Sequence, residues 1–247
     1  MSKILSVVVP AYNEEKTILL VIDRLTKILH DLDYEIVIVD DASHDRTANI
    51  VSELIKDHNN IRLFRHEQNQ GKTQALKTGF CECQGDIVIV QDADLEYNPA
   101  DMLRVISPIV QNTADVVYGS RLLNLATKES FMAKSYFANR VITFFSNLFT
   151  KFHFSDVETC YKAFRREIIQ NMVINSTRFG FEIEVTAKIS KLNVRITEVP
   201  ISFLSRSYAD GKKIGVKDGI QALFYIVKYN LFTSKKRSFK NVPNSFI

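Results

Sequence analysis

The chain has 247 residues, of which 46% are hydrophobic and 24% charged, and its formal net charge is +4. This composition is typical of one globular domain, or of a domain with an appended lobe, and the mild charge does not indicate nucleic-acid binding. Cys81, Cys83 and Cys160 are too few and too irregularly spaced for a disulfide framework or a zinc site, which favours a reducing, cytoplasmic compartment. The apolar run at residues 4–9 is too short for a signal sequence, and no stretch reaches the roughly 20 apolar residues of a membrane-spanning helix.

The first half of the chain alternates β-branched runs with amphipathic segments. β-branched runs predict strands at residues 5–9 and 87–90, the latter suited to burial on both faces of a parallel sheet, and further strands are predicted at residues 35–39 and 61–64. Helical spacing and helix-start signals predict three helices, within residues 18–32, 50–55 and 72–82. Asn13 and Asp45 are placed to cap the first two helices. This alternation predicts an α/β fold built on a parallel sheet.

Polar clusters follow three of these strands, at residues 10–14, 40–43 and 92–96. Because ligands of open α/β sheets bind at the carboxyl ends of the strands, we expect the clusters to line one site. The sequence contains neither G-x-G-x-x-G nor G-x-x-x-x-G-K-[S/T], which argues against dinucleotide-binding and P-loop proteins. An acidic, metal-dependent site for a diphosphate is favoured instead.

The third cluster carries acids at alternate positions, Asp92, Asp94 and Glu96, directly after a buried strand. Asn98 and Pro99 then have the form of a helix N-cap and a first helical residue. Carboxylates in this place are costly unless positive charge lies among them, and a hard divalent cation completed by phosphate oxygens is the natural partner. A D-x-D pattern alone is equally compatible with a solvated acidic turn.

The second half contains two aromatic-rich segments with apolar residues at helical spacing, 140–154 and 219–232. Their apolar stripes consist of Val141, Ile142, Phe145, Leu148, Phe149 and Phe152, and of Ile220, Leu223, Phe224, Val227 and Leu231. Both helices can pack into a core, or they can lie on an anionic membrane surface beside the basic residues Lys235, Lys236, Arg237 and Lys240. Further strands and a helix are expected within residues 156–166, 179–184 and 198–202.

The motifs V-V-V-P-A-Y-N-E, I-V-D-D-A-S-x-D-x-T, N-x-G-K, D-A-D-L-E and Y-G-S-R occur in this order, and together they resemble the family 2 glycosyltransferases. The later D-V-E-T-C-Y-K-A-F-R-R and G-K-K-I-G-V-K-D-G resemble the polyprenyl-phosphate sugar synthase branch, which includes dolichyl-phosphate mannose synthase. The resemblance implies a GT-A fold, which is a Rossmann-like α/β fold with a mostly parallel sheet flanked by helices. It also implies a nucleotide-diphosphate sugar donor, a divalent metal (Mg²⁺ or Mn²⁺) and inversion at the anomeric carbon. We expect one domain over residues 1–232, with a nucleotide-sugar half to about 122, an acceptor half after it, and a basic tail at 233–247.

The resemblance also implies roles for individual residues. The nucleoside pocket is expected to be lined by Pro10, Tyr12, Glu14 and Asp41. Asp94 and Glu96 match the metal ligands, Asp92 is expected beside the metal or the donor sugar, and several relatives have glutamine where this chain has Glu96. Phosphate contacts are expected from Lys72, Arg121, Arg206 and Lys212, with Lys213 able to replace Lys212.

Each role has a simpler alternative. Glu14 can be a first-turn acid favoured by the helix dipole, and Asp41 a turn residue. Lys72 can be an exposed helix-start lysine, and Arg121 a surface arginine after a strand. Arg206 and Lys212 can belong to a solvated basic loop.

The favoured function is transfer of a sugar to a polyprenyl phosphate, whose ionised oxygen needs no general base. The alternative is a sugar or lipid hydroxyl acceptor in cell-envelope glycan synthesis, which would need a base from Asp156, Glu158, Glu182 or Glu184. A non-catalytic nucleotide-sugar-binding subunit is a third hypothesis. The protein is expected to be peripheral on the cytoplasmic face of the membrane, and a homo-oligomer or a separate membrane partner remains open.

Overall fold

The computed structural model describes residues 5–124, 133–205, 216–241 and 246. Within them a seven-stranded sheet has the order β3-β2-β1-β4-β6-β5-β7, and every neighbouring pair is parallel except the two pairs that involve β6. The strands are β1 (Leu5–Ala11), β2 (Tyr34–Asp40), β3 (Ile61–Arg65), β4 (Ile87–Val90), β5 (Val116–Ser120), β6 (Lys162–Arg165) and β7 (Ile196–Pro200). The predicted α/β fold with a mostly parallel sheet is confirmed.

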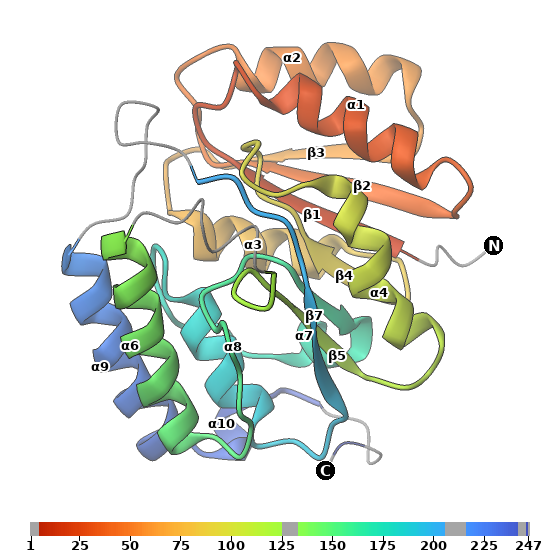
Figure 1. The fold of residues 1–247 in the computed structure, drawn as a ribbon. Helices are drawn as coiled ribbons and strands as arrows, with labels where there is room; N and C mark the ends of the chain where they lie inside the picture. Colours follow the sequence, from red (N-terminus) through yellow and green to blue (C-terminus); the bar gives the residue numbers. More distant parts are fainter. Residues whose placement is uncertain (1–4, 125–132, 206–215, 242–245, 247) are drawn as a thin grey trace.

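Helices cover both sides of this sheet (Figure 1). The α-helices are α1 (Ile18–Leu29), α2 (Thr47–Leu54), α3 (Lys72–Glu82), α4 (Met102–Val110), α6 (Ala133–Phe149), α7 (Arg166–Asn171), α8 (Phe181–Ile189), α9 (Val216–Leu231) and α10 (Lys235–Ser238). Short 3-10 helices are η1 (Ile55–Asp57) and η2 (Pro99–Asp101). Helices α1 and α2 lie on one side of β1, β2 and β3, and α3 lies on the other.

The antiparallel strand β6 decides which loops reach the ligand edge of the sheet. Parallel strands all end at the same edge, where ligands of such sheets bind. Because β6 runs the other way between β4 and β5, it is the segment before Lys162 that meets this edge. The loop 155–161 therefore lies among the strand ends, although in sequence it precedes a strand.

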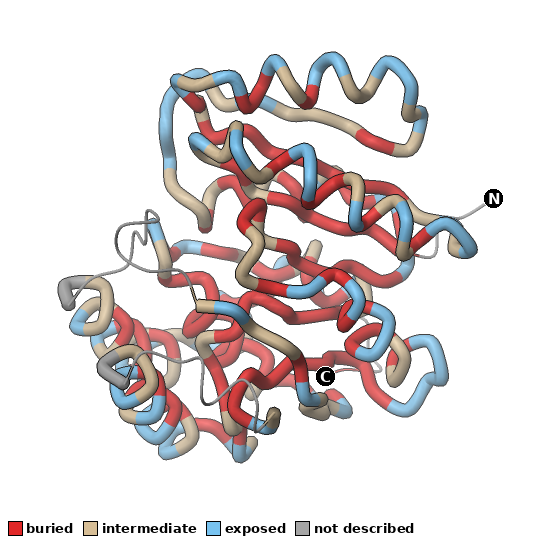
Figure 2. Tube along the Cα trace, turned by 45° about the horizontal axis from the view of Figure 1, so that its top comes forward, coloured by how far each residue is buried: buried red, intermediate tan, exposed pale blue. Residues whose placement is uncertain are grey.

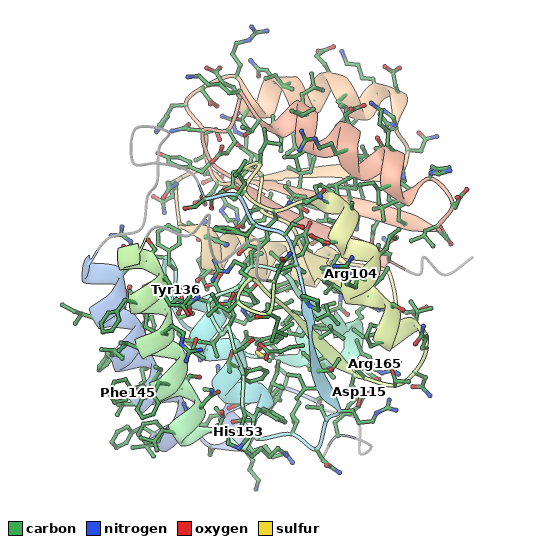
Figure 3. All side chains as sticks on the ribbon, in the orientation of Figure 1. Arg104, Asp115, Tyr136, Phe145, His153 and Arg165 are labelled. Carbon is green, nitrogen blue, oxygen red and sulfur yellow. The ribbon has the colours of Figure 1, made fainter. Side chains whose placement is uncertain are left out.

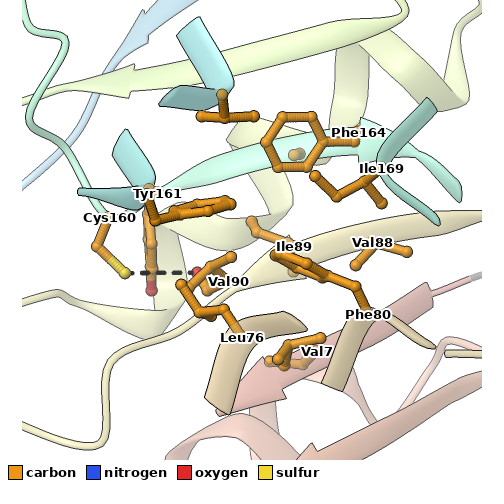
Figure 4. Close-up of a cluster of buried hydrophobic side chains, with 14 of the residues drawn as sticks. Val7, Leu76, Phe80, Val88, Ile89, Val90, Cys160, Tyr161, Phe164 and Ile169 are labelled. Carbon is orange, nitrogen blue, oxygen red and sulfur yellow. Dashed lines mark hydrogen bonds between the residues drawn. The ribbon is translucent and has the colours of Figure 1, made fainter. Parts of the chain in front are cut away.

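The core beneath this edge is apolar and closely packed. Figure 4 shows part of it, where Leu76 and Phe80 of α3 meet Ile89 of β4 and Phe164 of β6, all at most 2% exposed. Fully burying such a side chain contributes about 1.5–3 kcal/mol. The strand ends that carry the polar clusters are therefore supported by a well-packed apolar core.

The starts of three helices can be compared with the sequence prediction, which is wrong for one and confirmed for two. The prediction that Asn13 caps the first helix is wrong: α1 begins at Ile18, and Asn13 has a left-handed φ of 55°. Its Oδ1 instead accepts a hydrogen bond from the His44 N–H, because the chain turns before the helix starts. Asp45 does support the start of α2, since its Oδ1 accepts the Thr47 N–H at 2.9 Å. Asn98 likewise accepts the Ala100 N–H at the start of η2, as predicted.

Helices α6 and α9 lie side by side, and α8 packs against both. Figure 2 shows their outward surfaces as exposed. Of the predicted stripes, Ile142 is buried and Val141 and Leu223 are half-buried, but the remaining helical positions are exposed: Phe145, Leu148, Phe149, Ile220, Phe224, Val227 and Leu231. Phe152 lies outside α6, which ends at Phe149. None of the helices described is long and apolar enough to span a bilayer.

The residues after α9 return to the domain. Phe239 is buried and its strand-like segment bridges to Met172, while the Lys240 N–H donates to the Asn171 carbonyl. Asp115, which Figure 3 labels beside Arg165 just before β5, accepts hydrogen bonds from Arg165 and Arg195. Burial opposes ionisation of Asp115, yet these bonds hold its pKa well below the usual range. This network stabilises the end of the sheet away from the ligand edge.

Candidate active site

A cavity of about 610 Å³ lies at the carboxyl edge of the parallel strands. The nine predicted site residues that the structure describes all line it: Pro10, Tyr12, Glu14, Asp41, Lys72, Asp92, Asp94, Glu96 and Arg121. Arg206, Lys212 and Lys213 lie outside the described residues. Residues separated by more than a hundred positions in sequence are therefore brought to one cavity by the sheet order.

The acidic turn after β4 forms the middle of the cavity wall. Asp94 is buried and Glu96 is half-buried, and Asp94 Oδ1 accepts the Glu96 N–H at 3.0 Å. In the described part of the chain, no group of three or more His, Cys, Asp or Glu residues could hold a metal by itself. Two hard carboxylate ligands fit Mg²⁺ or Mn²⁺ only when diphosphate oxygens and water complete the coordination, which is a common way of binding Mg²⁺.

Asp41 fixes the loop that leads into α3. Its Oδ2 accepts the Gly71 N–H at 2.7 Å, and its Oδ1 accepts the Gln70 N–H at 2.9 Å and lies 2.7 Å from His66 Nδ1. Gly71 has a φ of 87°, a conformation that side chains rarely adopt. Both carboxylate oxygens of Asp41 thus contact protein groups, in keeping with the turn role that the sequence left open.

Lys72 is a mostly buried cation rather than an exposed helix-start lysine. Its Nζ lies 2.8 Å from Asp92 Oδ1 and 3.3 Å from Glu182 Oε1. Burial acts to lower the pKa of Lys72, but the charges of Asp92 and Glu182 raise that pKa well above its ordinary value. Lys72 therefore stays protonated and joins α3, the acidic turn and α8.

Arg121 is also buried, and it forms a forked ion pair with Asp156. Its Nε lies 2.7 Å from Oδ2 and its Nη2 2.9 Å from Oδ1, while Asn139 donates to the same Oδ1. Burial opposes ionisation of Asp156, but Arg121 lowers its pKa below the ordinary value. The guanidinium also lies 5.0 Å from the centre of the Phe203 ring. The surface-arginine interpretation is therefore wrong, and Asp156 is committed to holding Arg121.

The other acids weighed as bases differ sharply from each other. Glu184 is fully buried; it accepts the N–H groups of Asn175 and Ser176 and pairs with Lys188. It is a structural residue away from the cavity. Glu158 and Glu182, in contrast, line the cavity.

The sequence analysis did not single out Arg178, which also lines the cavity. Arg178 has a left-handed φ of 55°, and its carbonyl accepts hydrogen bonds from the Thr73 N–H (3.0 Å) and Oγ1 (2.9 Å). A Cβ on Gly71 would lie 3.2 Å from the Arg178 Cα, so the two backbones pass in close contact. No sequence pattern marks this position, because the contact joins segments that are more than a hundred residues apart.

The mostly parallel sheet flanked by helices, with an acidic cavity at the carboxyl edge of its strands, defines an α/β protein of the GT-A type. A solved structure of glucosyl-3-phosphoglycerate synthase from Mycobacterium tuberculosis, in complex with Mn²⁺, UDP and glucosyl-3-phosphoglycerate, has a TM-score of 0.71 to this chain and covers 92% of it and 80% of that chain. The identity is 20%, so this likeness bears on the fold alone. It confirms the predicted GT-A fold.

Residues 6–173, more than half of the chain, match the family model described as Glycosyl transferase family 2. The chain belongs to this family and is a glycosyltransferase. It is 30% identical over 228 residues to a dolichyl-phosphate beta-glucosyltransferase of Dictyostelium discoideum, covering 85% of this chain and 68% of that protein.

Two archaeal relatives are similarly close. A dolichol-phosphate mannosyltransferase of Pyrococcus furiosus is 30% identical over 212 residues, covering 85% of this chain and 59% of its own length. A UDP-N-acetylglucosamine–dolichyl-phosphate N-acetylglucosaminyltransferase of Methanococcus voltae is 30% identical over 242 residues, and the match covers 90% of this chain and 94% of that protein. The resemblance to the polyprenyl-phosphate branch is thereby confirmed, while the three relatives carry three different sugars in their names.

Proposed function

We propose that this glycosyltransferase moves a sugar from a nucleotide-diphosphate sugar to a polyprenyl phosphate, with a divalent metal and with inversion at the anomeric carbon. The observation that carries the proposal is one cavity in which the predicted nucleoside residues, the acidic turn, the mostly buried Lys72 and the buried Arg121 meet. The names of the three relatives, all of which include dolichyl or dolichol phosphate, support the choice of acceptor.

The proposed reaction requires mainly that the enzyme position the acceptor phosphate next to the anomeric carbon of the donor sugar. An oxygen of the acceptor phosphate attacks the anomeric carbon while the bond from that carbon to the donor diphosphate breaks, and the nucleoside diphosphate leaves. Asp94 and Glu96 would hold Mg²⁺ or Mn²⁺, which when bound offsets the negative charge on the diphosphate. Lys72, held by Asp92 and Glu182, presents a fixed positive charge to the same cavity. No proton needs to be removed from an ionised phosphate, so no base is assigned.

One observation favours the runner-up, which is transfer to a hydroxyl group. Burial, together with the charge of Glu182, raises the pKa of Glu158 to about 7, which suits a general base. The two functions make opposite predictions for Glu158→Gln. With a hydroxyl acceptor, loss of the base should lower turnover by about a hundred- to ten-thousand-fold. With a phosphate acceptor, no proton-transfer step is lost.

The test measures sugar transfer to polyprenyl phosphate and to the dephosphorylated alcohol, using UDP-glucose, UDP-N-acetylglucosamine and GDP-mannose as donors. We expect turnover with the phosphate only, and loss of turnover in a chelator. Arg206→Ala should lower turnover on polyprenyl phosphate more than it weakens binding of the free nucleotide, because this cation is proposed to hold the acceptor against an anionic donor. Wild-type turnover with the alcohol, abolished by Glu158→Gln and untouched by Arg206→Ala, would overturn the phosphate proposal.

We also propose that α6 and α9 hold the enzyme on the cytoplasmic face of a membrane, where a polyprenyl phosphate is presented. Their outward aromatic side chains, such as Phe144 and Phe224, are 64% and 61% exposed, and Lys236 and Arg237 are exposed nearby in sequence. Apolar side chains and basic residues together suit an anionic bilayer surface. Binding to vesicles should become stronger with more anionic lipid and weaker with more salt. Replacing one of the basic residues should weaken binding by about 1 kcal/mol. Salt-independent binding, or none, would contradict this part.

A further inference from the structure

Glu158 has a buried polar atom for which the protein supplies no partner. Its Oε1 makes no hydrogen bond within the described residues, although Glu158 is one of the residues that line the cavity. Leaving a buried acceptor unsatisfied costs about 1–3 kcal/mol, so such groups in native proteins call for an explanation. An atom of a bound ligand is the explanation that a cavity-lining position favours.

The loop around Glu158 is built to present it. The fully buried Nζ of Lys162 donates hydrogen bonds to the carbonyls of Val157 and Thr159, the residues on either side of Glu158. The same ammonium lies 4.6 Å from the centre of the Tyr118 ring. A buried lysine is rare unless it is paired, and here its partners are the two carbonyls that flank the carboxyl. Lys162 therefore fixes the backbone that carries Glu158 into the cavity.

The sheet order indicates which part of a ligand would meet this carboxyl. Along the ligand edge the strands run β2, β1, β4, β6, and neighbouring strands are about 4.8 Å apart. Asp41 follows β2, Tyr12 follows β1, and Asp94 follows β4. Glu158 precedes the antiparallel strand β6, which is the next position beyond Asp94. A nucleotide sugar laid along this edge, with its nucleoside at β1 and β2 and its diphosphate at β4, would place its sugar beside β6.

The surrounding charges leave Glu158 able to hydrogen-bond with a neutral polar group. The charges of Glu182 on α8 and of Lys162 on β6 both act on its carboxyl, and Arg121 is engaged by Asp156. Burial and the Glu182 charge favour the neutral carboxyl, which can both donate and accept a hydrogen bond. A sugar hydroxyl or an acetamido group has the same two capacities.

We propose that Glu158 is a specificity-determining residue that hydrogen-bonds a hydroxyl or amide group of the donor sugar. The inference rests on the proposed use of a nucleotide-sugar donor. A site that hydrogen-bonds a substrate group discriminates strongly against an analogue without it, because the buried partner is then left unpaired. Glu158 would therefore contribute to the choice among sugars that share one nucleotide.

The experiment compares binding of each nucleotide sugar with binding of the matching free nucleotide by titration calorimetry, with Mg²⁺ or Mn²⁺ present. The ligands are UDP-glucose, UDP-N-acetylglucosamine and GDP-mannose against UDP and GDP. Glu158→Ala should lower the affinity for the best-bound nucleotide sugar by about ten- to a hundredfold. It should change the affinity for the matching free nucleotide by less than about twofold. Glu158→Gln keeps a donor and an acceptor and should lose less than Glu158→Ala.

A matched control separates sugar contact from loop support. Glu198 is another half-buried acid whose oxygens accept the Ser155 and Asp156 N–H groups of the same loop, and it does not line the cavity. Glu198→Gln should leave the ratio of nucleotide-sugar to nucleotide affinity unchanged. Thermal unfolding gives a second readout: removing an unsatisfied carboxyl should leave the melting temperature of Glu158→Gln equal or higher, whereas a structural role would lower it.

Three outcomes would overturn the inference. The first is an unchanged affinity ratio in both Glu158 variants while nucleotide sugars still bind, which leaves the proposed function standing. The second is the same change in ratio for Glu198→Gln, which would assign the effect to the loop. The third is a wild-type protein that binds none of the nucleotides or nucleotide sugars, which would overturn the proposed function as well.

Discussion

The two ends of the ligand edge use their carboxylates differently. At the β2 end, the oxygens of Asp41 contact the Gly71 and Gln70 N–H groups and His66, so this acid shapes the cavity-lining loop that leads into α3. At the β6 end, Glu158 has a buried oxygen with no protein partner in the described structure. Both residues line the same cavity. A carboxylate beside a strand end can thus be part of the scaffold or part of the binding surface, and only its hydrogen bonds distinguish the two.

The acidic turn between these ends carries the largest predicted effect. Asp94→Asn should remove a metal ligand and cost several kcal/mol of transition-state stabilisation. This corresponds to a fall in kcat/KM on the order of a hundred- to a thousandfold or more. The measurement is sugar transfer at saturating Mg²⁺ or Mn²⁺. Asp45→Asn is the matched control, since Asp45 supports the start of α2 through Thr47 and does not line the cavity. Asparagine can still accept the Thr47 N–H, so that change should alter stability by less than about 1 kcal/mol and leave transfer per folded molecule intact. Full activity of Asp94→Asn would show that the turn holds no essential metal.

The scaffold role of Asp41 predicts an effect on stability itself. In Asp41→Asn one oxygen becomes an NH₂ group, which cannot accept the bonds now made to the loop or to His66. The free energy of unfolding should fall by about 1–3 kcal/mol, the cost of unsatisfied buried groups. Urea unfolding measures this change. Asp31→Asn, at a side chain that is 84% exposed, should stay within about 0.5 kcal/mol of wild type. Equal free energies of unfolding for the two variants would show that Asp41 does not stabilise the fold.

The sequence predicted the first half of the fold closely, because β1, β2 and β4 are runs rich in β-branched residues and almost fully buried. The segment Ile87–Val90 was placed to the residue, and all nine described site residues proved to share one cavity. Residues 155–161 were harder to place, since their position depends on β6 running antiparallel, which no local pattern reveals. The contact of Gly71 with Arg178 depends in the same way on the tertiary fold. Arg121 was predicted at the site, but its ion pair with Asp156 was not.

The proposed binding role of Glu158 predicts that nucleotide-sugar affinity depends on pH. Burial, with the charge of Glu182, raises the pKa of Glu158 to about 7, so the carboxyl is mostly neutral below pH 7 and mostly charged above it. Charged Glu158 can no longer donate a hydrogen bond to the sugar, so nucleotide-sugar affinity should fall as pH rises from 6 to 7.5, by at most about tenfold per unit. The range stops there because burial lowers the pKa of Lys162 to about 8. Glu158→Gln should flatten the profile, and an equally steep profile in that variant would assign the titration to another group.

The smallest predicted effect separates backbone from side chain at Arg178, on the rim of the cavity next to Gly71. Arg178 holds a φ of 55°, a conformation that costs a residue with a Cβ roughly 1–2 kcal/mol relative to glycine. Arg178→Ala keeps this cost and Arg178→Gly removes it, although the greater freedom of glycine in the unfolded chain offsets part of the gain. The glycine variant should therefore be more stable than the alanine variant by about 1 kcal/mol or less in urea unfolding. Both variants lose the guanidinium, so they should weaken nucleotide-diphosphate binding to the same extent. If the alanine variant were the more stable one, the left-handed backbone would carry no strain. If the two variants bound nucleotide differently, the loop geometry around Gly71, and not the positive charge, would be what Arg178 contributes to the cavity.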